Sequence, residues 1–154
     1  MAERKDRSRL VIDAPQEKIY QAFINREAFE TWLPPGDMTG DLKTFDAVEG
    51  GAYEMTLYYH DNEAIGKTTG NSDAFKGRFV ELVPYQRIVL ETAFETGSPA
   101  FGGTMRQTWT LADRGGSTEV IVECTDVPSG IDQQDHERGL LLSLYSLSDY
   151  MQAD

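Results

Sequence analysis

The sequence has little of what builds covalent cross-links or metal sites. Among its 154 residues are one cysteine, Cys124, and two histidines, His60 and His136. A single cysteine has no disulfide partner within the chain, and no group of cysteines, histidines and carboxylates has the spacing of metal ligands. Cys124 follows Val-Ile-Val-Glu, so we interpret it as a small buried hydrophobic residue of a strand. We therefore expect no metal and no cofactor.

Positive charge is also scarce. The chain has 14 Lys and Arg against 26 Asp and Glu, a formal net charge of −12. A surface of that charge repels phosphate backbones and anionic membranes. No window approaches the roughly 18 apolar residues of a membrane span, and no apolar run follows the charged start of the chain. We expect a cytoplasmic protein that binds neither nucleic acid nor membrane, as a monomer or weak homodimer.

The longest periodic stretch is the last one, His136 to Met151. At about 100° per residue its apolar side chains form one stripe, made of Leu140, Leu144, Leu147 and Met151. A helix of this length spans about 24 Å, enough to cross a sheet of ordinary strands. The length of the whole chain is typical of one domain with one core, and we expect residues 1–154 to form it.

Most of the remaining chain alternates with period two, which predicts strands. We expect them at Arg9–Ile12, Leu42–Val48, Ala52–Tyr59, Ala74–Val83, Arg87–Phe94, Thr104–Ala112 and Thr118–Thr125. Two short helices are expected after the first strand, one with Asp13 as its cap and Pro15 in its first turn, the other after Asn25. These helices plug one end of the sheet. The polar stretch from His60 to Asp73 is a candidate lid.

One predicted strand contains a conflict. Glu81 has the same phase as Phe75 and Phe79, whose side chains we expect to face the core. Either a β-bulge rotates Glu81 outward or a carboxylate faces the interior.

Several segments together resemble a known family. They are Asp13-Ala14-Pro15 before a helix, Trp32 closing the second helix, the Gly77, Glu81, Pro84 spacing before an apolar strand, the Thr108–Val120 hairpin, and the final helix with His136-Glu137-Arg138-Gly139-Leu140. From Arg9 to Met151 the chain resembles the activator-of-heat-shock-protein-ATPase-like branch of the START-like (SRPBCC) superfamily. The resemblance implies the α+β helix-grip fold. This fold is a curved antiparallel sheet, here of about seven strands, around a long C-terminal helix, with two short helices after the first strand and a cavity between sheet and helix.

The leading functional hypothesis is the binding of a small apolar or aromatic ligand in that cavity, with no covalent step. The candidate cavity residues combine apolar and aromatic side chains with a few polar ones: Tyr53, Met55, Leu57, Phe79, Glu81, Gln107, Trp109, Val122, His136, Leu140, Leu144 and Tyr145. No serine or cysteine has a sequence context that suggests activation by a base, so we predict no catalytic residue.

Two alternatives remain open, because the superfamily includes ligand carriers, cyclases and a domain of a heat-shock co-chaperone. One is a cyclase or lyase that uses a cavity carboxylate or histidine as general base. The other is a protein-interaction module of the co-chaperone type. A buried and paired Glu81 or His136 with space before it favours the enzyme, a closed apolar cavity favours the carrier, and an exposed apolar patch favours the interaction module.

Overall fold

The structure is a computed structural model that describes residues 4–34, 38–58, 72–94 and 102–152. In order, its elements are β1 (Asp6–Ile12), α1 (Gln16–Ile24), α2 (Arg26–Trp32), β2 (Thr39–Phe45), β3 (Ala52–Tyr58), β4 (Ser72–Val83), β5 (Arg87–Phe94), β6 (Met105–Asp113), β7 (Thr118–Thr125) and α3 (Gln133–Gln152). The strands form one antiparallel seven-stranded sheet in the order β1-β7-β6-β5-β4-β3-β2. The predicted α+β helix-grip fold is therefore confirmed.

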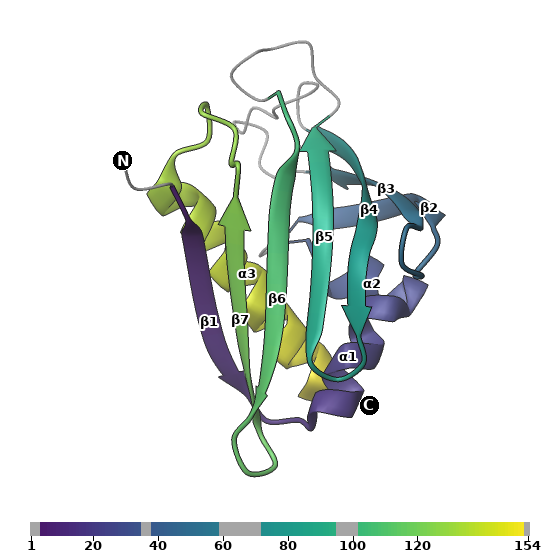
Figure 1. Ribbon diagram of the computed structural model, residues 1–154, viewed down its shortest axis with the longest axis vertical. Coiled ribbons are helices and arrows are strands. Elements are labelled where there is room, and N and C mark those ends of the chain that lie inside the picture. Colours follow the sequence, from purple (N-terminus) through teal and green to yellow (C-terminus); the bar gives the residue numbers. More distant parts are fainter. Residues whose placement is uncertain (1–3, 35–37, 59–71, 95–101, 153–154) are drawn as a thin grey trace.

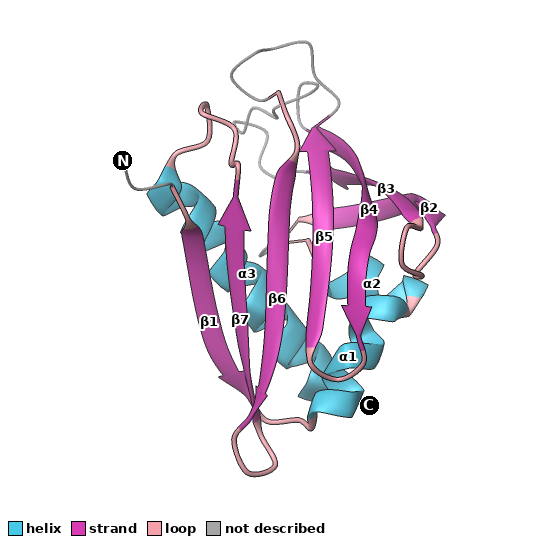
Figure 2. Cartoon of the chain, viewed as in Figure 1, coloured by secondary structure: helices cyan, strands magenta, loops and turns pink. Residues whose placement is uncertain are grey.

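The three helices lie on one face of the sheet. Figure 1 shows α3 running diagonally behind β1, β7 and β6, with α1 and α2 gathered near its C-terminal end. In Figure 2 no helix of the described residues covers the opposite face of these strands. Within the described ranges no helix has both the length and the apolar character needed to cross a bilayer.

The predicted stripe of α3 is confirmed. All four of its members are buried against the sheet: Leu140, Leu144, Leu147 and Met151. Ser143 is buried on the same side, where its hydroxyl donates to the Leu33 carbonyl over 2.7 Å. This bond ties the middle of α3 to the end of α2.

Aromatic rings close the end of the sheet where α1 and α2 lie. Trp32 and Trp109 are fully buried, with ring centroids 5.5 Å apart in an edge-to-face arrangement. Phe23 contacts both rings, at 4.7 Å from Trp32 and 5.3 Å from Trp109. The Trp32 indole donates to the Ala22 carbonyl over 2.8 Å, so its polar atom is satisfied inside the core. The short helices therefore plug this end, as predicted.

Glu81 points outward because the strand is irregular. The register of β4 against β5 shifts between Phe79 and Glu81, so the pairing skips one residue there. Phe79 stays fully buried, while the Glu81 side chain is 40% exposed and accepts from Arg87 over 2.6 Å. Of the two alternatives left by the sequence, the bulge is the correct one.

Some predicted boundaries and one predicted cap are wrong. α1 begins at Gln16 with Pro15 at its N-cap and has no side-chain cap, so Asp13 does not cap it. Asp13 instead accepts from the Ser117 hydroxyl at 3.4 Å. β2 spans Thr39–Phe45 rather than Leu42–Val48, because the chain turns early. The turn is fixed by a bond from the Asp46 N–H to the Ala52 carbonyl.

Two further predictions concern the start of the last helix and the candidate lid. α3 begins at Gln133, three residues before the predicted start, and the Asp132 carboxylate accepts from the Asp135 N–H at its first turn. The candidate lid lies mostly outside the described residues, and its last two residues, Ser72 and Asp73, belong to β4.

Candidate ligand-binding site

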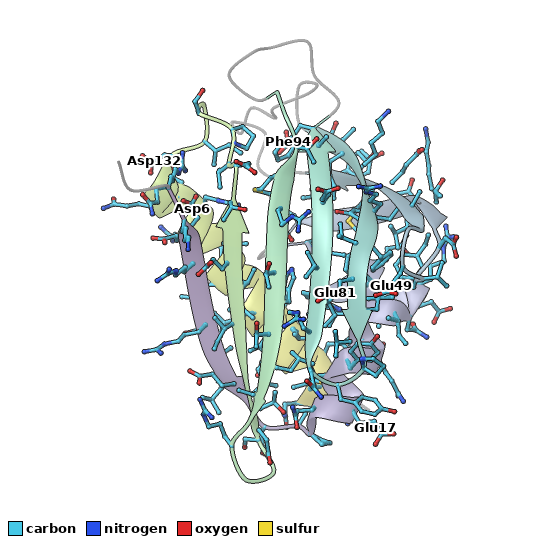
Figure 3. All side chains as sticks on the ribbon, viewed as in Figure 1. Asp6, Glu17, Glu49, Glu81, Phe94 and Asp132 are labelled. Atoms are coloured by element: carbon cyan, nitrogen blue, oxygen red, sulfur yellow. The ribbon has the colours of Figure 1, made fainter. Side chains whose placement is uncertain are left out.

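A cavity of about 550 Å³ lies between the sheet and the first half of α3. Its walls combine strand residues, the start of α3 and the segments beside it: Leu33, Met38, Tyr53, Leu57, Asp73, Phe75, Leu90, Thr92, Phe94, Met105, Gln107, Trp109, Gly130, Ile131, Asp132, Asp135, His136, Gly139, Leu140 and Ser143. Two of them, Phe94 and Asp132, are labelled near the upper end of the molecule in Figure 3. The cavity therefore lies toward the end of the sheet opposite α1.

The strand walls follow from the alternation of side chains. Neighbouring strands present every second residue to the same face, and here that face points to α3. β5 contributes Leu90, Thr92 and Phe94, while β6 contributes Met105 and Gln107 beside Trp109. The alternation in β5 was visible in the sequence, yet its residues were not among the predicted cavity residues.

Small residues on α3 make the space. His136, Gly139 and Ser143 follow one another at intervals of three and four residues, so they continue the buried stripe toward the start of the helix. A Cβ placed on Gly139 would meet no atom within 4 Å. Two small residues, Gly139 and Ser143, therefore line the cavity together with His136 and Leu140. This spacing is the sequence signal that the prediction missed.

Six of the twelve predicted cavity residues line the cavity: Tyr53, Leu57, Gln107, Trp109, His136 and Leu140. Four others are buried in the filled part of the core, namely Met55, Phe79, Val122 and Leu144. The remaining two were wrongly placed. Glu81 is turned outward by the bulge, and Tyr145 lies on the outer face of α3 with half of its surface exposed.

A buried carboxylate orients His136 at the cavity wall. The His136 ring uses Nδ1 to bond the Asp6 carboxylate over 2.7 Å. Asp6 is fully buried, and the Arg4 guanidinium donates to both of its oxygens over 2.9 Å. Arg4 also donates to the Ile131 carbonyl over 2.7 Å, so the cluster joins β1 to the segment that enters α3. In Figure 3 the labelled Asp6 lies at the start of β1, on the side of the molecule where Asp132 is labelled.

The balance of interactions keeps Asp6 ionised. Burial raises the pKa of its carboxyl, but the hydrogen bonds from Arg4 and His136 outweigh burial, and the pKa lies below its ordinary value. The Asp6 partner of His136 comes from β1, 130 residues away, and only the fold brings the two together.

Two further polar residues of the wall bond mainly to the wall itself. The Tyr53 hydroxyl donates to the Glu91 carbonyl over 3.0 Å and also contacts the Thr92 hydroxyl. Burial raises the pKa of Tyr53, so it remains a neutral phenol. The Gln107 carbonyl oxygen accepts from the Trp109 indole over 3.1 Å, which leaves the amide nitrogen as a donor for a ligand.

The described residues contain no group of three or more His, Cys, Asp and Glu side chains placed to hold a metal ion. Cys124 is fully buried, and burial raises the pKa of its thiol, so the thiolate is disfavoured. Its interpretation as a small buried hydrophobic residue is confirmed.

Solved structures share this architecture. Protein CV1439 from Chromobacterium violaceum is 30% identical, with a TM-score of 0.85 over 97% of this chain and 98% of that one. A protein from Arthrobacter aurescens is 12% identical, with a TM-score of 0.79 over 96% and 86%. Protein NE0264 from Nitrosomonas europaea is 18% identical, with a TM-score of 0.75 over 99% and 96%. The last two show the fold alone.

The sequence itself matches one family model. Residues 13–152 match the model described as activator of Hsp90 ATPase homolog 1-like protein. A search of the curated proteins finds no match. The matched range includes all of the segments that carried the resemblance seen in the sequence. The chain therefore belongs to the activator of Hsp90 ATPase homolog 1-like family, a family of ligand-binding or interaction domains.

Proposed function

We propose that this protein binds a small apolar or aromatic molecule in the cavity between the sheet and α3. The observation that carries the proposal is the cavity itself, about 550 Å³ in volume and lined mainly by apolar and aromatic side chains. Pockets for small molecules and cofactors span about 300 to 1,000 Å³ and combine such a lining with a few polar groups. Four aromatic residues contribute here, namely Tyr53, Phe75, Phe94 and Trp109.

Binding of this kind needs no covalent step. Each Å² of apolar ligand surface removed from water contributes about 25 cal/mol. The sheet holds the walls on one side. On the other side the middle of α3 is joined to the end of α2 through the bond from Ser143 to Leu33. A preformed site of this kind loses little free energy to ordering when the ligand enters.

A neutral fluorescent probe tests the proposal. N-phenyl-1-naphthylamine suits a protein of net charge −12, because it carries no charge to be repelled. We expect saturable binding of one probe per chain, with increased emission. Replacing Leu57 by Trp should weaken binding roughly tenfold or more, since the indole fills the cavity that Leu57 lines.

A matched control introduces the same new side chain, tryptophan, at an exposed position away from the cavity. Val11 is 56% exposed on edge strand β1, so Val11→Trp should leave probe affinity unchanged. Absence of saturable binding to the wild-type protein would contradict the proposal. Equal affinity in Leu57→Trp and the wild type would show that the probe binds elsewhere.

A proton-transfer enzyme is a second candidate, favoured by one observation. His136 lines the cavity and is oriented by the buried carboxylate of Asp6, an arrangement that suits a general base. In D₂O, the apolar ketone 2-tetralone should then acquire deuterium beside its carbonyl faster with the wild-type protein than with His136→Phe. Equal exchange rates would exclude His136 as a base for this substrate.

A further inference from the structure

The tautomer of His136 is fixed by its surroundings. An ionised carboxylate only accepts hydrogen bonds, so the bond between Nδ1 and Asp6 requires the proton on Nδ1. In the neutral imidazole the other nitrogen, Nε2, is then an acceptor. Arg4 holds both oxygens of Asp6, so the carboxylate cannot turn away from the ring.

Nε2, the acceptor nitrogen of the His136 ring, has no hydrogen-bond partner in the described part of the protein. Among the described residues no hydrogen bond involves Nε2, the His136 side chain is only 14% exposed, and the residue lines the cavity. The acidic side chains beside it on the wall, Asp132 and Asp135, are themselves acceptors when ionised and cannot donate to Nε2. An acceptor left unpaired beside an apolar ligand costs free energy, whereas a donor on the ligand removes that cost.

We propose that His136 selects ligands with a hydroxyl group on an apolar body, and that a phenol is the best match. The inference rests on the proposed ligand-binding function and narrows it to a chemical class. The aromatic walls bind the ring system, and the hydroxyl donates to Nε2. A hydrocarbon or an ether of the same shape leaves Nε2 unpaired, and a carboxylate is repelled by Asp132 and Asp135. Asp6 is a positioning residue that holds the acceptor in place.

Three related molecules test this selectivity: 2-naphthol, 2-methoxynaphthalene and naphthalene. They share one apolar body, and only 2-naphthol donates a hydrogen bond. At mildly alkaline pH, calorimetry on the wild-type protein should show 2-naphthol bound roughly 3- to 10-fold more tightly than the other two, the factor expected for one net hydrogen bond.

The variant His136→Phe keeps a planar ring and removes the acceptor. It should lower the affinity for 2-naphthol to that for 2-methoxynaphthalene, while binding of the other two molecules is unchanged. Tyr145→Phe is the matched control, because it removes a hydroxyl from the exposed face of the same helix. It should preserve the preference.

A second measurement keeps His136 in place, so it does not depend on whether a variant at this position folds. The chain has two histidines, so ring-¹⁵N spectra contain two sets of signals, which His60→Gln assigns. The Nε2 resonance of His136 should shift when 2-naphthol is added and stay in place with 2-methoxynaphthalene.

Each contrary outcome has a distinct meaning. Equal affinity for 2-naphthol and its ether in the wild type, a preference that survives in His136→Phe, or an unmoved Nε2 resonance would overturn the selectivity while leaving the cavity as a binding site. Failure of all three molecules and of the neutral probe to bind would overturn the proposed function and the selectivity together.

Discussion

Both halves of α3 contact the sheet, but in different ways: the C-terminal, closed half packs into the apolar core, whereas the N-terminal, open half bonds to β1 and borders the cavity. The C-terminal half presents Leu144, Leu147 and Met151, which are buried in the filled core beside α1 and α2. The N-terminal half presents His136 and Gly139, which line the cavity instead. Leu140 also lines the cavity, so the clearest difference lies at Gly139, which has no side chain and faces open space.

The two halves also differ in what holds them together. The closed half is held by apolar burial and by edge-to-face rings such as Trp32 and Trp109. The open half is held by a buried ionic cluster in which Arg4 and His136 bond to Asp6. We therefore expect substitutions in the closed half to change mainly the free energy of unfolding. Substitutions at the cavity wall should change mainly binding, whereas the ionic cluster also contributes to stability.

The largest expected effect is in the closed half. Leu144→Ala should lower the free energy of unfolding by about 2 to 5 kcal/mol, because it removes a fully buried side chain and leaves a void among close-packed neighbours. Urea denaturation followed by circular dichroism measures the change. Leu142→Ala on the exposed face of α3 is the matched control, with an expected loss below about 0.5 kcal/mol. Similar losses in both variants would mean that Leu144 is not in a packed core.

Adding volume to the closed half should be the next most damaging change. Val122 is fully buried and pairs with Trp109 across the β6–β7 ladder, so Val122→Phe should cost about 1 to 3 kcal/mol through overpacking. The thermal midpoint checks the loss. The control is Ala93→Phe on β5, which alternates away from the face that Leu90 and Thr92 present to the cavity. If Ala93→Phe is the more damaging variant, the two faces of the sheet are assigned backwards.

The sequence predicted the closed half better than the open half. The stripe of α3 and the alternation of the strands are local patterns with a fixed period, so they show which side chains turn inward. The conflict at Glu81 was also visible, although the sequence alone could not choose the bulge. What resolved it is the register of β4 against β5, a property of paired strands.

The open half depends on contacts between distant parts of the chain. The pairing of Asp6 with His136 joins the first strand to the last helix, and no local pattern encodes it. The predicted cavity residues Tyr145 and Glu81 do not line the cavity for a related reason. Their polar character suggested a site, but the sequence did not show which way their side chains point.

Gly77, one of the residues that carried the family resemblance, has a structural reason to be glycine. A Cβ there would lie 2.7 Å from the Tyr53 hydroxyl and 1.8 Å from the Glu91 carbonyl, so only glycine fits.

The ionic cluster of the open half should give a smaller effect on stability, and one that depends on pH. Asp6→Asn should lower the free energy of unfolding by about 1 to 2 kcal/mol at neutral pH, because it weakens charge-assisted hydrogen bonds from Arg4 and His136. Glu91→Gln on the outer face is the matched control. Its carboxylate pairs with Arg78 and Arg106 in a partly exposed setting, where an ion pair contributes about 0 to 1 kcal/mol.

The sign of the pH dependence follows from the lowered pKa of Asp6. In the unfolded chain an aspartate titrates near its ordinary pKa of about 3.9, and in the folded protein Asp6 titrates below that value. The stabilisation is therefore complete above about pH 4 to 5 and is lost as the pH falls through the folded pKa. Denaturation series at several pH values should show the difference between wild type and Asp6→Asn shrinking only in acid. A difference that grows in acid would contradict the assignment.

The smallest expected effect tests where the site ends. The Glu81 side chain is 40% exposed on the outer face and pairs with Arg87 across the β4–β5 hairpin. Glu81→Gln should therefore change the free energy of unfolding by less than about 0.5 kcal/mol, since exposed ion pairs contribute little. It should also leave the affinity for N-phenyl-1-naphthylamine unchanged, because the bulge after Phe79 turns the carboxylate away from the cavity. Denaturation and probe titration on the same variant measure both quantities. If the substitution alters probe binding by more than about twofold, which corresponds to roughly 0.4 kcal/mol, Glu81 communicates with the cavity and the outer face belongs to the site.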